Sequence, residues 1–268
     1  MAFLKKDFQL TVFGARGSMA ACRDDCSAFG GNTSCYMVQA GEETVFLDGG
    51  SGLASAPARY PKPPVILLSH LHLDHIMGLG MFTGFFVPGQ RARLYVPFCE
   101  DDESAANMIA RVFAPPFWPL KLSDLEGKPE ILAMPQRLSV GNVEIETMEG
   151  NHPDRTMVYR LNYDGRSIVY ATDYEVDEPS FARLADFASG ADLLLYDAQF
   201  TEEEYPKKRG FGHSTAIKGL ELMQRSGAGR LLLIHHAPSS SDMVLQKREM
   251  MLNKINVLYA RQGETYAV

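Results

Sequence analysis

The stretch VILLSHLHLDH at residues 65–75 decides how the rest of the chain is interpreted. Its apolar first half is typical of a buried strand, so the residues after the serine are expected to lie in a loop. In such a loop His70 and His72 can point the same way. Leu71 and Leu73 are then expected to face the core.

This segment has the side chains of a metal site. Asp74 and His75 open the next turn, so two imidazoles can face one cation and a carboxylate with an imidazole can face a second. Neutral imidazole and carboxylate suit Zn²⁺, Mn²⁺ or Fe²⁺. Paired metals about 3.5–4 Å apart clamp attacking and leaving oxygens and lower the pKa of a shared water toward about 7. We predict two divalent transition-metal ions, zinc first; a chance cluster of histidines in a loop is the alternative.

Polar side chains also follow other apolar runs at the points where those runs end. They are Asp48, His152, Asp173, Asp197 and His235. Because the carboxyl ends of adjacent strands meet at one rim of an α/β sheet, we expect these side chains to share one site with the histidine motif.

Composition narrows the class of protein. The 268 residues are 46% hydrophobic and 22% charged, which is typical of a globular chain. Lys plus Arg is 26 and Asp plus Glu is 33, so the formal charge of −7 provides no overall attraction to nucleic acid or anionic membranes. No apolar run reaches the ~18 residues of a membrane span, and no secretory signal is evident. We expect one cytoplasmic domain over residues 1–268, with no membrane partner.

Two cysteines, Cys22 and Cys26, lie close together in the sequence. They are expected to be reduced thiols in a surface loop, as in most cytoplasmic proteins. A zinc clip is the alternative, although no second cysteine pair completes it.

Short β-branched runs predict ten strands, at 10–13, 34–38, 44–47, 65–68, 94–96, 143–148, 157–161, 167–171, 193–196 and 231–234. Helices are predicted after Asp101, Asp177, Ser214 and Ser241. Ser214 or Thr215 can cap the third helix, and Gly227 can end it. Asp164-Gly165 predicts a hairpin turn. Strands interspersed with helices indicate a layered α/β protein.

The pattern H-x-H-x-D-H after an apolar strand resembles the signature of the metallo-β-lactamase superfamily. The resemblance continues in chain order through FLDGG at 46–50, GNH at 150–152, ATD at 171–173 and LIH at 233–235. It implies a four-layer αββα sandwich with two metal ions at one edge.

The resemblance also implies which residues bind the metals. They are His70, His72 and His152 for the first ion, Asp74, His75 and His235 for the second, and Asp173 as a bridge. His235 is preferred because it directly follows the strand; the alternative is that His236 binds and His235 packs. Asp48 has no ligand position left, so it is expected to orient a ligand or to cap the strand end.

Further segments resemble the ribonuclease Z branch and its phosphodiesterase relatives. They are GARGS at 14–18, GNTS at 31–34, YDAQF at 196–200 and GFGHST at 210–215. YDAQF stands where that branch carries a His-Glu-Ala-Thr segment. The likeness is strongest to bacterial stand-alone hydrolases with Y-D-A-Q-F/Y-T and G-H-S-T. It implies hydrolysis of a phosphodiester by metal-bound hydroxide.

In that chemistry His213 would be the general acid for the departing alkoxide. Asp197 would keep it protonated, because a nearby carboxylate raises the pKa of an imidazole. Asp74 is expected to serve in catalysis as well as in metal binding. The alternatives are a solvent-exposed His213 at a helix start and an Asp197 that only ends a strand.

Four residues are predicted to contact substrate: Ser214, Thr215, Asn32 and Trp118. The first two lie at a helix start, where backbone N–H groups bind phosphate, but they could equally act only as caps. Asn32 could equally stabilise a turn. The proline-rich stretch 113–120 could place Trp118 in a lid or stacking wall, in a homodimer contact, or on the core.

The chain lacks the long basic arm that ribonuclease Z enzymes use to hold tRNA. One basic run, at 207–209, could steer an anionic substrate or be a solvated loop. We therefore predict a small nucleotide-like phosphodiester as substrate rather than folded nucleic acid. The alternatives are a lactone or thioester hydrolase and a non-catalytic binding or regulatory protein.

Overall fold

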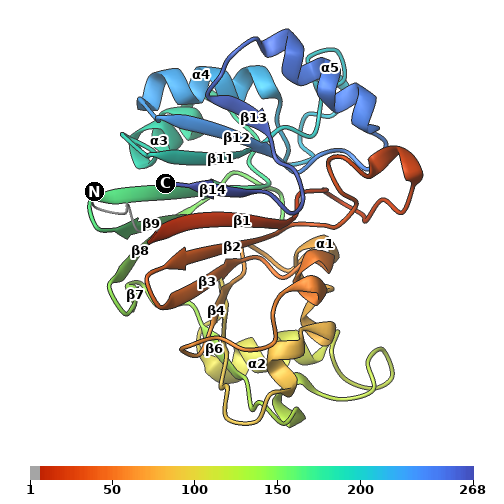
Figure 1. The fold of residues 1–268 in the computed structure, drawn as a ribbon, viewed down its shortest axis with the longest axis vertical. Coiled ribbons are helices and arrows are strands. Elements are labelled where there is room, and N and C mark those ends of the chain that lie inside the picture. The colour runs from red at the N-terminus through yellow and green to blue at the C-terminus, as the bar shows by residue number, and fades with distance from the viewer. Residues whose placement is uncertain (1–6) are drawn as a thin grey trace, which may run out of the picture.

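The computed structural model describes residues 7–268, which form two mixed seven-stranded sheets (Figure 1). The first sheet has the order β14 (Thr265–Ala267), β1 (Phe8–Gly14), β2 (Cys35–Ala40), β3 (Glu43–Leu47), β4 (Val65–Leu67), β5 (Arg93–Val96) and β6 (Glu130–Ala133). The second has the order β13 (Val257–Tyr259), β12 (Arg230–Ile234), β11 (Leu193–Asp197), β10 (Arg166–Ala171), β9 (Met157–Tyr163), β8 (Val143–Glu149) and β7 (Leu138–Val140).

Three buried apolar clusters define four layers. The central cluster joins side chains from the facing sides of the two sheets, such as Leu10, Val45, Leu161 and Leu195. On the outer side of the second sheet lie the helices α3 (Glu178–Phe187), α4 (Ala216–Ser226) and α5 (Asp242–Leu252). On the outer side of the first sheet lies α2 (Asp102–Ala110). The predicted αββα sandwich is confirmed.

Local sequence signals account for the helix boundaries. Asp101 and Asp177 each accept a hydrogen bond from the backbone of the third helical residue and begin α2 and α3. Thr215, rather than Ser214, caps α4 in the same way, and Gly227 ends it at φ 70°. These predicted helices and the hairpin at Asp164 are confirmed.

All ten predicted strands are present, but β6, β7, β13 and β14 escaped prediction. Each has only three or four residues and lies at an edge of one of the two sheets, and so short a run carries too few residues to show a strand pattern. The orientation expected for Leu73 was wrong. This leucine begins the short helix α1 (Leu73–Ile76) and is 59% exposed, because the helix turns it away from the core.

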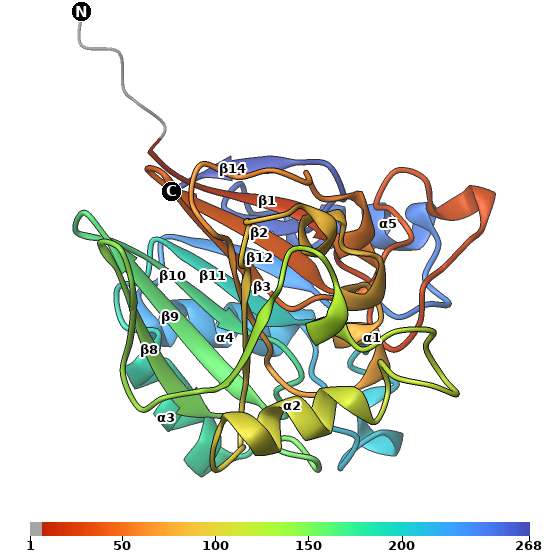
Figure 2. The same cartoon turned by 90° about the horizontal axis from the view of Figure 1, so that it is seen from below.

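The parallel strands of both sheets end at the same side of the sandwich, where α1 lies (Figure 2). Strands β3 and β11 are buried along their whole length, as expected for parallel strands covered on both faces.

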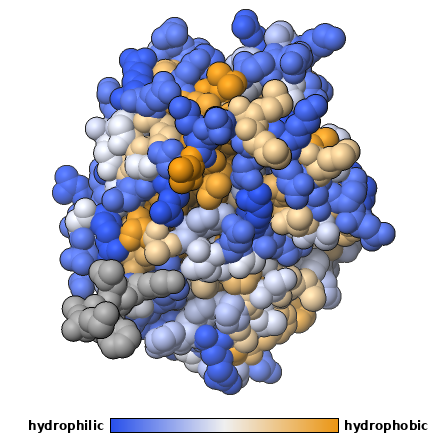
Figure 3. Space-filling model, turned by 45° about the horizontal axis from the view of Figure 1, so that its top comes forward, coloured by the Kyte–Doolittle hydropathy of each residue, from blue (hydrophilic) through white to orange (hydrophobic). Residues whose placement is uncertain are grey.

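Figure 3 shows one face of the molecule, on which hydrophilic side chains surround scattered apolar ones. Within residues 7–268, no helix has the length and apolar character needed to cross a bilayer.

Candidate metal centre

The side chains expected at the site are delivered by strand ends whose backbone turns sharply. Asp48 follows β3, Asp173 follows β10 and His235 follows β12, and their φ angles are 62°, 48° and 60°. Left-handed backbone at residues other than glycine costs of order 1–3 kcal/mol and clusters at functional sites. At this rim the turns place all three side chains against His75.

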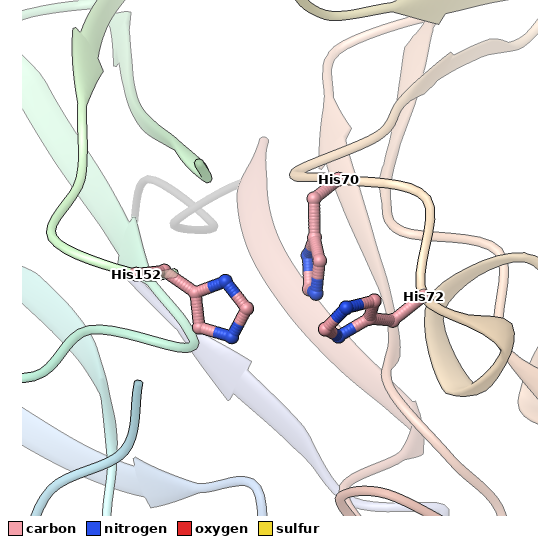
Figure 4. Close-up of side chains that lie close together, drawn as sticks. All are labelled: His70, His72 and His152. Atoms are coloured by element: carbon pink, nitrogen blue, oxygen red, sulfur yellow. The ribbon is translucent and has the colours of Figure 1, made fainter. Parts of the chain in front are cut away.

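The first cluster consists of His70, His72 and His152 (Figure 4). His70 and His72 come from the loop after β4, and His152 comes from a loop on the opposite side. One ring nitrogen of each lies within 4.8 Å of those of the other two. This spacing fits three imidazoles around one transition-metal ion.

The second cluster consists of the buried residues Asp74, His75 and His235. Asp74 Oδ2 lies 3.2 Å from His75 Nε2 and 3.1 Å from His235 Nε2. Asp173 lies between the clusters: its Oδ2 is 3.2 Å from His75 Nε2, and its Oδ1 is 4.0 Å from His70 Nε2. The seven side chains expected from residues 70 to 235 therefore meet at one place.

The two clusters differ in their electrostatics. Burial alone would lower the pKa of His75 and His235, but neighbouring carboxylates, above all Asp173, raise the pKa of His75 well above its ordinary value and that of His235 to about 9. Burial lowers the pKa of His70 strongly and that of His152 to about 4. The second cluster thus attracts positive charge, whereas His70 and His152 of the first present neutral imidazoles, the form that binds metals.

The ring nitrogens themselves support a metal site. Nε2 of His70 is buried and makes no hydrogen bond with any residue in 7–268. Nε2 of His75 and Nδ1 of His235 are also buried; carboxylate oxygens lie 3.2 and 3.3 Å from them, but without the geometry of a hydrogen bond. Burying a polar atom without a partner costs about 1–3 kcal/mol. The donor set of imidazoles and carboxylates with unpaired buried nitrogens fits a dinuclear transition-metal site.

Asp48 holds one of these histidines in place. Its carboxylate accepts hydrogen bonds from Ser69 N, Ser69 Oγ and Tyr170 OH, and its Oδ2 lies 2.6 Å from His75 Nδ1. With Nδ1 engaged, Nε2 of His75 is the nitrogen that faces Asp74 and Asp173. Of the two expectations for Asp48, orientation of a ligand is thus supported.

Asp154 has a comparable position, which was not predicted from the sequence. Its carboxylate Oδ2 lies 2.8 Å from His72 Nε2, and its backbone N–H donates to His152 Nδ1 at 3.3 Å. One residue thereby orients two imidazoles of the first cluster. The only signal in the sequence was its place two residues after His152, which is too common a spacing to predict a role.

The predicted pair of His213 and Asp197 also meets at this site. His213 Nδ1 lies 2.9 Å from Asp197 Oδ2 and 3.5 Å from Asp173 Oδ1. The His213 side chain is 12% exposed, and its ring stacks on that of His235 with centroids 4.8 Å apart. The alternative of a solvent-exposed histidine does not hold.

The neighbouring side chains of His235 and His236 have different surroundings. His235 joins the cluster, whereas His236 Nε2 donates to the carbonyl oxygen of Ala260 at 2.8 Å and its ring packs on Phe29 and Tyr259. The preference for His235 agrees with this arrangement, because only its ring nitrogens reach the carboxylates.

The four predicted substrate contacts have structural partners. Ser214 Oγ accepts a hydrogen bond from Tyr196 OH, Thr215 caps α4, and Asn32 Nδ2 donates to a backbone carbonyl oxygen. Trp118 packs edge-on against Phe113. Their contact with substrate stays a prediction.

The cysteine pair is not gathered into a metal site. Cys22 is exposed and Cys26 is buried, and both are free thiols. Among residues 7–268, no group of side chains with metal-binding spacing contains either one. The zinc clip is therefore not supported.

Comparison with known proteins agrees with this geometry. The beta-lactamase superfamily domain matches residues 43–236, which is most of the chain. The chain belongs to the metallo-β-lactamase superfamily. Membership in this superfamily and the buried His/Asp clusters together indicate a metal-dependent hydrolase.

Relatives of this superfamily member include enzymes of several kinds. Ribonuclease Z of Ignicoccus hospitalis is 27% identical, with 77% of this chain and 80% of the relative covered. The probable metallo-hydrolase YhfI of Bacillus subtilis is 25% identical, with 85% and 86% covered. The crystal structure of YhfI superposes with a TM-score of 0.72 at 21% identity, covering 97% of this chain and 98% of YhfI.

A diphosphatase from the PhnP family has the same fold as this superfamily member. Its TM-score is 0.70 at 18% identity, and the match covers 97% of this chain and 96% of the diphosphatase. Zn²⁺-bound PqqB from Methylobacterium extorquens also has a TM-score of 0.70, at 15% identity, covering 97% of this chain and 100% of PqqB. These structures establish the fold that places the clusters at one edge.

Proposed function

We propose that the protein is a dinuclear metal-dependent phosphodiesterase that hydrolyses a small nucleotide-like phosphodiester. The observation that carries this proposal is the contact of His213 with Asp197 beside both clusters. A histidine held by a carboxylate next to a metal pair is suited to protonate a departing alkoxide. Hydrolysis of a lactone or thioester depends less on such an acid.

The proposed ligands fall into two sets around one bridging residue. The first ion would be held by His70, His72 and His152, the second by Asp74, His75 and His235, and both by Asp173. When bound, two ions of Zn²⁺, Mn²⁺ or Fe²⁺ neutralise charge on the phosphoryl oxygens and lower the pKa of water. Asp74 also accepts the backbone N–H of Ser18 at 2.7 Å, which fixes its carboxylate.

The proton donor is assigned from its hydrogen bonds. Asp197 is buried and also accepts the backbone N–H groups of Gln199 and Ser214, so its carboxylate is fixed. It engages Nδ1 of His213, which leaves Nε2 as the nitrogen that delivers a proton to the leaving oxygen. The position of His213 thus depends on Asp197.

The size of the neighbouring cavity supports a small substrate. A cavity of about 340 Å³ lies beside His152 and is also lined by Asn151, Pro153 and Gly210. Cavities of roughly 300–1,000 Å³ accommodate small molecules. The names of the relatives, ribonuclease Z and a diphosphatase, favour a substrate in which a P–O bond is hydrolysed.

A side-by-side screen of metal-loaded protein tests the proposal. Phosphodiesters, lactones and thioesters are offered with Zn²⁺, Mn²⁺ or Fe²⁺, and bound metal is measured in protein purified without chelator. We expect about two ions per chain and turnover of the phosphodiesters. Turnover of carboxylic substrates alone would refute the phosphodiesterase while leaving the metal site, and a protein without metal would refute both.

A substitution separates the two hydrolase classes further. His213→Ala is expected to reduce turnover of a phosphodiester about 10²- to 10⁴-fold, the usual contribution of a general acid. Glu203→Ala, an exposed substitution in the same segment, is the control and should change turnover little. Equal activity of His213→Ala and the unmodified protein would contradict the assigned proton donor.

A further inference from the structure

The carboxylate of Glu175 lies outside the metal clusters and accepts several hydrogen bonds from a single loop. Glu175 accepts the backbone N–H of Gly210 at 2.8 Å to each oxygen and that of Gly212 at 2.9 Å. It also accepts the hydroxyl of Tyr205 at 3.2 Å. Hydrogen bonds to an ionised carboxylate are roughly twice as strong as those between neutral groups.

The loop has few other attachments. Most side chains between residues 202 and 211 are exposed, so apolar burial contributes little to holding the loop. Its remaining backbone hydrogen bonds are local, from Tyr205 to Thr201, from Lys207 to Glu204, from Lys208 to Tyr205 and from Phe211 to Lys208. The Tyr205 hydroxyl also lies 3.4 Å from the carbonyl oxygen of Val176. Glu175 is therefore the main attachment of this segment to the body of the protein.

The loop leads directly into the active site. Gly212 lies against the ring of His152: a Cβ on this glycine would be 1.9 Å from His152 Cδ2. The next residue is His213, whose Nδ1 reaches Asp197. A displacement of the loop would thus move the proposed acid and remove the packing of a proposed ligand.

Glu175 is itself fixed to the segment that carries His152. Its backbone N–H donates to Asn151 O at 2.9 Å, and Asn151 Nδ2 donates to Glu175 O at 2.8 Å. The residue also lies two positions after Asp173. Through its backbone and its side chain, one residue therefore joins three segments of the site.

We propose that Glu175 is a positioning residue: it holds the loop 202–212 so that His213 stands at the departing oxygen. This inference rests on the proposed function, in which His213 is the proton donor. A misplacement of about 1 Å costs a reaction about 10²-fold. Glu175 also lines the cavity beside His152, but both of its carboxylate oxygens are engaged by the loop, so we assign its effect to His213 and the loop.

The kinetic test uses the full-length, metal-loaded protein with Glu175→Ala and Glu175→Gln. We expect Glu175→Ala to reduce kcat about 10- to 100-fold. The loss should be larger for an alkyl leaving group than for p-nitrophenolate, which departs without protonation. Glu175→Gln retains one acceptor oxygen and should be intermediate. Glu203→Ala, an exposed control in the same loop, should match the unmodified protein.

A double mutant separates positioning from general stabilisation. If Glu175 acts through His213, then Glu175→Ala in a His213→Ala background causes little further loss in kcat. Metal content and thermal unfolding of each variant show whether it remains folded. Independent, multiplying losses, or equal losses for both leaving groups, would overturn the proposal.

Hydrogen exchange tests the attachment without any assay of activity. In metal-loaded Glu175→Ala, the amides of Gly210 and Gly212 should exchange at least tenfold faster, and the amide of Ser214, which binds Asp197, should change less. Unchanged exchange at both glycines would overturn the inference even if phosphodiesters are hydrolysed. Faster exchange in a protein that hydrolyses no phosphodiester would instead refute the proposed function while retaining the attachment.

Discussion

The Oδ2 atom of Asp48 lies 2.6 Å from Nδ1 of His75, and both side chains are completely buried. Asp48 also accepts hydrogen bonds from Ser69 and from the hydroxyl of Tyr170. A carboxylate on the far nitrogen of a metal-binding imidazole fixes the tautomer and the direction of the ring. This relationship joins the core of the sandwich to the proposed metal centre.

Asp48→Asn is expected to weaken binding of the second metal. The amide group of asparagine would face donors that now point at a carboxylate, so metal affinity should fall about 10- to 100-fold. Competition with a coloured chelator measures the affinity of the purified protein. Asp164→Asn, in the exposed turn between β9 and β10, is the matched control. Equal affinity in both variants would show that Asp48 does not orient His75.

Asp154→Ala should affect the first metal alone. The variant loses the contact at 2.8 Å with His72 Nε2 but keeps the backbone N–H that donates to His152. We expect about a tenfold weaker affinity for one of two ions. Because Asp154 is exposed, the free energy of unfolding of the metal-free protein should change by less than about 0.5 kcal/mol. A loss of both ions would show that Asp154 does not act on the first metal site alone.

Gly212→Ala and Gly210→Ala form a matched pair. Both glycines have a positive φ, 86° and 85°, so each substitution carries a similar backbone strain of about 1–3 kcal/mol. Only at Gly212 does the new Cβ collide with the ring of His152, since nothing lies within 4 Å of a Cβ at Gly210. Gly212→Ala should therefore lose more metal and more turnover. Metal content and kcat measured side by side test this, and equal losses would mean that strain alone matters.

Removal of the metals should destabilise the protein. A ligand that binds only the folded state raises the free energy of unfolding by about 2.7 kcal/mol when its free concentration is 100 times its Kd. The effects of two such sites add. Dialysis against a chelator should lower Tm, and added Zn²⁺ should restore it. The variant Asp173→Ala, which lacks the proposed bridge, should show a much smaller difference between the two conditions. A Tm that is independent of metal would contradict a dinuclear site.

Much of the fold could be predicted because its signals are local. The helix caps Asp101 and Asp177 and the buried runs of β3 and β11 depend on neighbouring residues alone. The histidine motif likewise lies within a few residues, so its chemistry is visible in the sequence. The edge strands and the exposed Leu73 depend on distant packing and were missed or misjudged.

Some of the residues that hold the metal-binding side chains and the loop in place could not be predicted from the sequence. Asp154, Tyr170 and Glu175 carry no motif, and each gains its role from a partner elsewhere in the chain. Spacing in the sequence does not report such contacts, because they form only when separate loops are brought to one rim by the sheets. They became visible only with the tertiary structure.

The amino-acid sequence by itself determined the types of donor, their order along the chain and the sandwich that carries them. Only the tertiary structure decided that His235 rather than His236 faces the carboxylates, and that His213 reaches Asp197. The physical reason is that residue identity specifies which atoms can bind a metal or carry a proton. Their direction depends on backbone turns and on hydrogen bonds to side chains that are far away in the sequence.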